Sequence, residues 1–257
     1  MEAFQRHVAA RPRLVWLDRA WLAEIMGENA TDHQVTSYPG IDSVLLDQER
    51  DADSLEVWGL WLEFGVWTGG TLRTTAHHLS RLGHPQTVVY GFDSLRGLPE
   101  RWHDFEAGEF DMEGRVPKNM PPNTELVIGW FNETVPTFLS GLRDGARGGE
   151  SLDIQWLHVD CDVYSSHRYV LSALAGLFVA GTVIIFDDLL NYQDYEQHGL
   201  LALYEFQQET GWTFEIIAAP WRVDWAWSVP SYWHLHHWWL RMMRSVAIVL
   251  RAKSWRR

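Results

Sequence analysis

The stretch WLEFGVWTGG, residues 61–70, decides the fold, because it joins an apolar strand to a glycine-rich turn. Tryptophan, leucine and phenylalanine side chains suit a buried strand. The turn has the spacing G-x-x-x-G-G, which lets the backbone bend sharply and approach a ligand closely. Its glycines are Gly65, Gly69 and Gly70. Glu63 interrupts the apolar strand just before the first glycine, so the turn is a candidate binding site that carries a carboxylate.

The charge of Glu63 bears on the kind of ligand. The first amides of the following helix have no partner within the helix, and in a dinucleotide site they hold a pyrophosphate. A carboxylate next to that anion would be unfavourable. S-adenosylmethionine fits better, because it has no phosphate and carries a sulfonium and an ammonium. A glycine-rich turn with a solvated glutamate explains the same residues, and on this stretch both interpretations stay open.

From about residue 56 onward, strand-like and helix-like segments alternate. The pattern predicts strands at 57–64, 86–92, 125–128, 154–159, 181–187, 213–218 and 224–229. It predicts helices at 69–82, 132–143, 166–179 and 196–210. Such alternation gives parallel βαβ units, so we expect an α/β protein with a doubly wound, mostly parallel sheet and helices on both faces. The last two strands are joined by a short turn, and we expect them to pair antiparallel at the end of the sheet.

Acidic residues follow three of these strands, at the ends where a doubly wound sheet binds its ligands. Asp93 ends the second strand and is placed to accept hydrogen bonds from both hydroxyls of a ribose; an aspartate in a turn or helix cap is the alternative. Two later strands end in Asp160 and Asp162, and in Asp187 and Asp188. Carboxylates brought close repel one another unless a proton or a cation intervenes. Such oxygen ligands suit Mg²⁺, although aspartates that cap the next helices would leave the same pattern.

The composition excludes some classes of protein. With 257 residues, 46% hydrophobic and 21% charged, the chain can bury the core of a large α/β domain. The net charge of −13 counts against nucleic acid as the main partner, because phosphate binding needs clustered Lys and Arg. A single cysteine excludes an internal disulfide and indicates a reducing compartment. The first residues contain no apolar signal-peptide core, so we expect a cytoplasmic protein.

The chain divides into three predicted parts. Residues 1–55 are expected to form an N-terminal helix and a lid segment, residues 56–230 the core, and residues 231–257 a separate basic, aromatic tail. The tail carries six Arg or Lys residues and no acid. We interpret it as an amphipathic helix with two open roles, which are contact with an anionic membrane surface and docking in a homo-oligomer.

Five stretches together resemble the class I S-adenosylmethionine-dependent methyltransferases, and within them the macrocin O-methyltransferase type that modifies sugar hydroxyls. They are LEFGVWTGGTLR (62–73), YGFDSLRGLPE (90–100), ELVIGWFNETVPTFL (125–139), LHVDCDVYSS (157–166) and VIIFDDLLNYQDYEQHG (183–199). The resemblance spans residues 57–218. It implies a seven-stranded sheet whose last strand is antiparallel, a Rossmann-like methyltransferase fold.

The resemblance also implies roles for individual residues. The methionine part of the cofactor would contact Glu63, Gly65, Gly69 and Gly70. The ribose would contact Asp93 and Ser94, and the adenine would contact Trp130 and Phe131. Metal-dependent members bind Mg²⁺ through positions that match Asp160, Asp187 and Asp188. Many relatives have a glutamate after the first aspartate of the last pair, so the ligand set stays open.

The expected reaction is an in-line displacement, in which an acceptor oxygen attacks the methyl group of the sulfonium. Fixed orientation contributes about 7–11 kcal/mol in favourable cases. Asp160 is the first candidate for the base, or for a metal ligand beside it, and His167 is the second, with a surface histidine as the alternative. The loop 97–123 is expected to close over a small-molecule or glycan acceptor. Three of its side chains would either stack on a sugar or pack onto the core: Trp102, His103 and Phe105.

Two other functions compete with this interpretation. A nucleotide-dependent oxidoreductase would need a G-x-G-x-x-G turn, and residues 65–70 lack that spacing. A non-catalytic protein that kept the fold and is tethered through its tail would bind S-adenosylmethionine and methylate nothing. The acidic set speaks against this second alternative.

Overall fold

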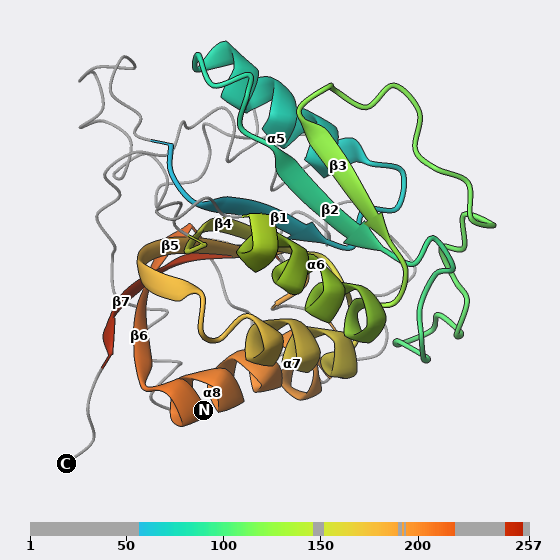
Figure 1. The fold of residues 1–257 in the computed structure, drawn as a ribbon. Helices are drawn as coiled ribbons and strands as arrows, with labels where there is room; N and C mark the ends of the chain where they lie inside the picture. Colours follow the sequence, from blue (N-terminus) through green and yellow to red (C-terminus); the bar gives the residue numbers. More distant parts are fainter. Residues whose placement is uncertain (1–56, 146–151, 190–191, 193, 219–244, 254–257) are drawn as a thin grey trace, which may run out of the picture.

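Seven strands form one sheet in the computed structural model, in the order β3-β2-β1-β4-β5-β7-β6 (Figure 1). The strands are β1 (Leu60–Phe64), β2 (Val89–Asp93), β3 (Thr124–Ile128), β4 (Ile154–Val159), β5 (Phe178–Phe186), β6 (Trp212–Ala218) and β7 (Val246–Lys253). Strands β1 to β5 pair in parallel, and β7 runs antiparallel to both β5 and β6. The structure describes residues 57–145, 152–189, 192, 194–218 and 245–253. The predicted α/β fold class and doubly wound sheet are confirmed.

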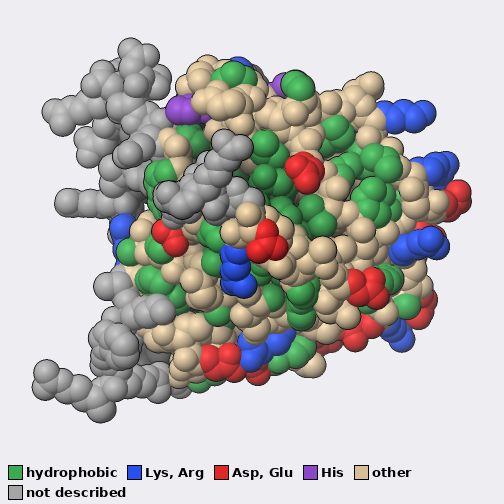
Figure 2. All heavy atoms as spheres, in the orientation of Figure 1, with side chains coloured by type: hydrophobic (Ala, Val, Ile, Leu, Met, Phe, Trp, Pro, Cys, Tyr) green, Lys and Arg blue, Asp and Glu red, His purple; other side chains and the backbone are tan. Residues whose placement is uncertain are grey.

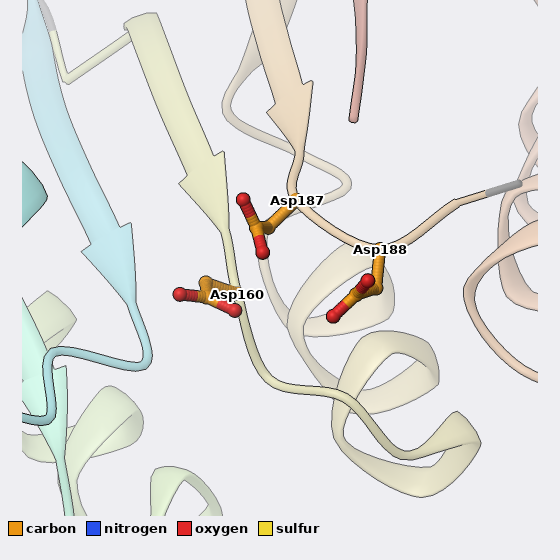
Figure 3. A group of neighbouring side chains, drawn as sticks. All are labelled: Asp160, Asp187 and Asp188. Atoms are coloured by element: carbon orange, nitrogen blue, oxygen red, sulfur yellow. The ribbon is translucent and has the colours of Figure 1, made fainter. Parts of the chain in front are cut away.

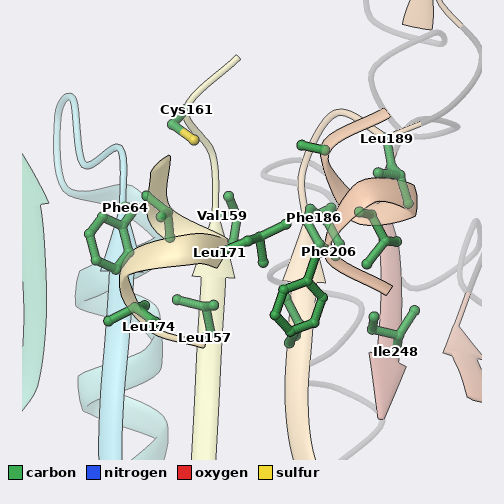
Figure 4. Close-up of a cluster of buried hydrophobic side chains, with 14 of the residues drawn as sticks. Phe64, Leu157, Val159, Cys161, Leu171, Leu174, Phe186, Leu189, Phe206 and Ile248 are labelled. Carbon is green, nitrogen blue, oxygen red and sulfur yellow. The ribbon is translucent and has the colours of Figure 1, made fainter. Parts of the chain in front are cut away.

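Helices cover both faces of the sheet. They are α5 (Gly70–Arg81), α6 (Phe131–Gly145), α7 (Tyr164–Ala173) and α8 (Gly199–Thr210), with a short 3₁₀ helix η2 (Tyr195–Gln197) before α8. On one face, apolar side chains of β1, β4, β5 and β7 pack against α7 and α8, as Phe64, Leu171 and Phe206 do (Figure 4). On the other face, Leu72 and Leu79 of α5 lie among buried strand residues.

The surface over the helices is mixed in charge. Acidic and basic side chains are interspersed on the face that Figure 2 shows. Arg168 of α7, for example, contacts Glu205 and Glu209 of α8 at 3.1 and 2.6 Å. Pairs of this kind at the surface, even when partly buried, contribute little to stability, so the packing of α7 on α8 rests on their apolar faces.

The register of the parallel strands brings the carboxyl ends of four strands, β1, β2, β4 and β5, to one edge of the sheet. Phe64 of β1 lies opposite Phe92 of β2 and Val159 of β4, and Val159 lies opposite Phe186 of β5. The residues that follow these four positions therefore leave the sheet at the same level. This edge is the carboxyl end, where the predicted site residues are expected to meet.

The prediction for the end of the chain was wrong in one respect. Residues 246–253, assigned to an amphipathic helix, form strand β7 between β5 and β6. Among the described residues, β7 is the antiparallel partner of β6. Val246, Ala247, Ile248 and Leu250 have no exposed surface. A short apolar run fits a buried helix or a buried strand equally well, and here the free edge of β5 selects the strand.

Other predictions concern segments outside the described residues. These are the N-terminal helix and lid segment at 1–55, the strand at 224–229, and the aromatic part of the tail at 231–244, with its expected roles in membrane contact or oligomerisation. Within the described residues, no helix has the length and apolar character needed to cross a membrane.

Candidate active site

Three carboxylates meet at the carboxyl ends of β4 and β5 (Figure 3). Asp160 follows β4, and Asp187 and Asp188 follow β5. One oxygen of each lies within 4.8 Å of the others. Asp160 and Asp187 are half-buried, Asp188 is buried, and the Ser245 hydroxyl donates to Asp187 Oδ1 at 3.3 Å. The structure therefore brings together three of the four aspartates that were expected to converge here, and we call them the aspartate trio; Asp162 is not part of this group.

The three carboxylates of the trio repel one another when all are charged. Burial raises the pKa of Asp160 well above its usual range, and the charges of Asp187, Asp162 and Asp188 raise it further. Like charges held this close favour a shared proton or a bound cation. The ligand atoms offered are all carboxylate oxygens, which hard divalent ions prefer. The arrangement can thus hold a divalent cation beside a reacting oxygen.

Asp93 holds the glycine turn in place. Its Oδ2 accepts hydrogen bonds from the backbone amides of Val66 and Trp67, both at 2.8 Å, and its Oδ1 accepts one from Leu95 at 2.7 Å. A carboxylate has about four acceptor positions, and three are used here. In this conformation Asp93 has room for one ribose hydroxyl rather than the expected two. The neighbouring Ser94 hydroxyl accepts a hydrogen bond from the Arg96 amide at 3.1 Å.

Glu63 is buried, with 1% of its surface exposed, so the interpretation as a solvated glutamate is wrong. Its Oε2 lies 3.3 Å from Nδ1 of His158, which is the residue opposite it on β4. The backbone amide of Leu72, in the first turn of α5, also favours the charged form of this carboxylate. Burial raises the pKa of Glu63, and the contacts with His158 and Leu72 oppose that shift.

These contacts explain why the turn is unsuited to a phosphate. The amides of Val66 and Trp67, which point toward a pyrophosphate in a dinucleotide site, here donate to the carboxylate of Asp93, and the Leu72 amide favours the charged form of Glu63. An additional anion would meet two carboxylates and few free donors. The turn is therefore better matched to a ligand with a cationic part, as the sequence indicated.

The glycines of the turn are required for packing within the protein. A Cβ on Gly65 would lie 1.7 Å from the carbonyl oxygen of Asp160, and one on Gly69 would lie 2.9 Å from Sδ of Met120 in the loop 97–123. Both have positive φ, +90° and +78°. The close approach predicted for a ligand is thus made by the protein at these two positions. Gly70 begins α5.

Exposed apolar side chains gather around the ends of β1 and β3. Trp130, predicted to lie near the adenine, is 37% exposed directly after β3, and Ile128 at the end of that strand is 50% exposed. Phe131 instead packs edge-on against Phe64, with ring centroids 5.1 Å apart, and belongs to the core packing. Trp130 remains the candidate for contact with a planar base.

The sequence reasoning missed Trp67. It lies inside the glycine turn with φ of +45° and 44% of its surface exposed, and its ring meets Phe110 of the loop 97–123 at 5.9 Å. A positive φ is uncommon for a bulky residue and marks local constraint. The signal was present in the sequence as a tryptophan between the glycines of a ligand-binding turn.

His167 does not have the position that a base needs. It is fully buried, its Nδ1 lies 3.0 Å from the carbonyl oxygen of Val163, and its ring stacks on Phe186. Burial lowers its pKa to about 4. A side chain without exposed surface cannot reach an acceptor in this conformation, so His167 is a core residue, neither the predicted second base nor a surface histidine.

The loop 97–123 packs onto the core at its first aromatic residue. Trp102 is 3% exposed, and the centroid of its ring lies 5.8 Å from those of both Phe105 and Tyr192. It therefore packs onto the core and does not face a sugar. His103 is half-buried and lies 4.8 Å from Tyr192. The loop is joined to α7 by a hydrogen bond of 2.6 Å from Ser165 to Glu100.

Comparisons with known proteins agree with this geometry. Among solved structures, the chain is similar to CalS11, calicheamicin methyltransferase, with 20% identity over 85% of this chain and 80% of that chain and a TM-score of 0.51. It is also similar to the O-methyltransferase NovP, with 20% identity over 76% of this chain and 72% of that chain and a TM-score of 0.49. A third similar structure is the O-methyltransferase from Bacillus cereus in complex with SAH, with 12% identity over 96% of this chain and 89% of that chain and a TM-score of 0.42. At 20% identity the likeness to CalS11 shows the fold alone. The other two structures have TM-scores below 0.5 and give no further evidence for the fold.

No match was found among curated proteins. The family model described as Macrocin-O-methyltransferase (TylF) matches residues 45–228, which include the glycine turn, Asp93 and the aspartate trio. Since this match covers most of the chain, the protein belongs to the Macrocin-O-methyltransferase (TylF) family and is an S-adenosylmethionine-dependent O-methyltransferase.

Proposed function

We propose that this methyltransferase acts on a hydroxyl of a sugar or of a glycosylated small molecule, and that Mg²⁺ bound by Asp160, Asp187 and Asp188 assists the transfer. The acceptor class is supported by the family, which is named for an O-methyltransferase of macrocin, and by the likeness to calicheamicin methyltransferase. The aspartate trio is the observation that carries the proposal, because a hard cation between the three carboxylates would relieve their repulsion.

The residues of the trio fit Mg²⁺ in number and chemistry. They offer oxygen atoms only, within 4.8 Å of one another, and they leave further coordination positions for substrate or water. When bound, the ion would orient two vicinal hydroxyls of the acceptor and lower the pKa of one of them. Asp160 either ligates the ion or lies beside it and accepts the acceptor's proton.

The carboxyl ends of β1, β2 and β3 would hold the methyl donor. The glycine turn, fixed by Asp93 and Glu63, would take the methionine part, and Trp130 would lie against the adenine. In the reaction the acceptor oxygen forms a bond to the methyl carbon while the carbon–sulfur bond breaks. The sulfonium becomes a neutral thioether, and the hydroxyl proton leaves toward Asp160. The contribution of the chain is mainly orientation of the two reactants.

The test uses the full chain, S-adenosylmethionine and a panel of methyl glycosides with vicinal diols, next to catechol as a non-sugar diol. We expect transfer to at least one glycoside, detected by mass spectrometry, and its loss when EDTA removes divalent ions and its return with Mg²⁺. Asp187→Asn should bind S-adenosylhomocysteine and lose most of its methyl transfer. Asp153→Asn, the same change just before β4 at the opposite end of the sheet, is the matched control. Methylation of catechol only would overturn the acceptor class, and full activity in EDTA would overturn the role of the metal.

A further inference from the structure

A buried acid–imidazole pair lies beneath the glycine turn. Glu63 of β1 and His158 of β4 are opposite each other in the parallel register, and each is 1% exposed. Glu63 Oε2 and His158 Nδ1 are 3.3 Å apart, an ion-pair distance, although the ring N–H is not aligned for a straight hydrogen bond. Burial of a charge is costly unless it is paired. Each group therefore stabilises the other in a place that water does not reach.

Glu63 also lies close to the start of α5. Leu72 is the third residue of α5, and its amide is one that an N-cap side chain usually accepts from. The N-cap of α5 is Gly69, which has no side chain, and the first turn contains no acid. Glu63 reaches this amide from the neighbouring strand. A negative charge there is also favourable for the helix dipole, so the start of α5 depends on where the Glu63 carboxylate points.

His158 has no other described group to hold it. Its Nε2 is buried and has no hydrogen-bond partner among the described residues, and its ring lies 5.9 Å from that of Trp156. The imidazole is therefore fixed by packing and by Glu63. Replacing it with a side chain that lacks a donor next to Oε2 would leave the Glu63 carboxylate buried without this partner, and the carboxylate would move.

We propose that His158 is a positioning residue for the methyl-donor site. Its Nδ1 group orients Glu63, and Glu63 in turn fixes the start of α5 and the backbone of residues 66–70. The inference rests on the assignment of this turn to the methionine part of the cofactor. His158 itself touches neither reactant, so its effect should be confined to that part of the ligand.

Two ligands and two substitutions test this. S-adenosylhomocysteine carries the amino-acid part, and 5′-methylthioadenosine has the same adenosine without it. His158→Asn keeps an amide N–H near the position of Nδ1, whereas His158→Gln places its amide near Nε2. By isothermal titration calorimetry, we expect His158→Gln to bind S-adenosylhomocysteine at least about tenfold more weakly, equivalent to about 1.4 kcal/mol, with 5′-methylthioadenosine within about twofold of wild type. His158→Asn should restore most of the lost affinity.

The control is His78→Asn, which changes another buried histidine, on the later part of α5, away from the turn. It should leave the ratio of the two affinities unchanged. Equal losses for both ligands in His158→Gln, or no loss for either, would overturn the inference. If His158→Gln fails to fold, Glu63→Gln must show the same selective loss. If the wild type binds S-adenosylhomocysteine tightly and the His158 variants bind it equally well, only this inference is refuted. If the wild type does not bind S-adenosylhomocysteine, the assignment of the turn to the cofactor is refuted.

Discussion

Asp93 and Asp187 are the same residue type at the same edge of the same sheet, and their surroundings differ completely. Asp93 ends β2 and accepts hydrogen bonds from three backbone amides. Asp187 follows β5 and lies beside two further carboxylates. The first charge is compensated by the chain and serves to build the glycine turn. The second lies beside like charges and accepts a hydrogen bond only from the Ser245 hydroxyl among the contacts described above, so a bound cation would stabilise it. Asp93 therefore shapes the backbone of its half of the edge, whereas Asp187 offers its charge to a bound cation.

The strongest way to test this contrast is Asp187→Asn. We expect the rate of methyl transfer to fall by about 100-fold or more, because a bound metal contributes several kcal/mol to stabilising the reacting oxygen. The melting temperature without divalent ions should not fall, since the change removes repulsion. Activity assays and thermal denaturation measure the two effects. Retained activity together with lost stability would mean that Asp187, like Asp93, is a structural residue.

Asp93→Asn should show the opposite balance. An asparagine cannot accept all three amide hydrogen bonds, and bonds to charged groups are worth about 1.5–3 kcal/mol each when buried. Because Asp93 is half-buried, we expect a total loss of about 1–3 kcal/mol in the free energy of unfolding. Affinity for S-adenosylhomocysteine should fall by about tenfold, or 1.4 kcal/mol, as the turn loosens. Urea denaturation and calorimetry would show this. Unchanged stability would contradict the role given to Asp93 in holding the turn.

The pH dependence of stability sharpens the comparison further. The pKa of Asp160 is raised in the folded state, so between the ordinary carboxyl pKa and the raised value the folded protein binds more protons than the unfolded one. Without divalent ions, stability should therefore decline as the pH rises through that window. Asp160→Asn should remove the decline and raise the melting temperature at neutral pH, by about 2–4 °C for each kcal/mol gained. A wild type whose stability increases through the window would contradict the repulsion within the trio.

The smallest effect on catalysis is expected at His167. His167→Asn keeps an N–H for the Val163 carbonyl, and we expect methyl transfer within about threefold of wild type, whereas loss of a general base costs about 10²–10⁴-fold. Since burial lowers the pKa of His167 to about 4, the wild type should lose stability as the pH falls from 6.5 towards 4. The substitution should flatten that acid limb. A loss of activity comparable with that of Asp187→Asn would restore His167 as a catalytic residue.

Much of the fold and the grouping of the site followed from local pattern. Apolar runs that end in glycine or aspartate predicted the strands, and parallel connections placed Asp93, Asp160 and Asp187 at one edge. The end of the chain was not predictable in the same way. Residues 246–250 are apolar without a clear period, and their strand conformation comes from pairing with β5 and β6. The burial of His167 was also beyond the sequence, because it depends on how α7 packs over Phe186.

The sequence by itself determined the alternation of strands and helices, the glycine turn and the acids at the strand ends, because these depend on neighbours along the chain. The tertiary structure decided what each charge meets. Glu63 lies beside His158 on the adjacent strand and near Leu72 in the next helix, whereas three aspartates lie beside one another. The energy of a buried charge depends on partners a few ångströms away in space. Side chains that looked alike in the sequence therefore acquired different roles only when the sheet was assembled.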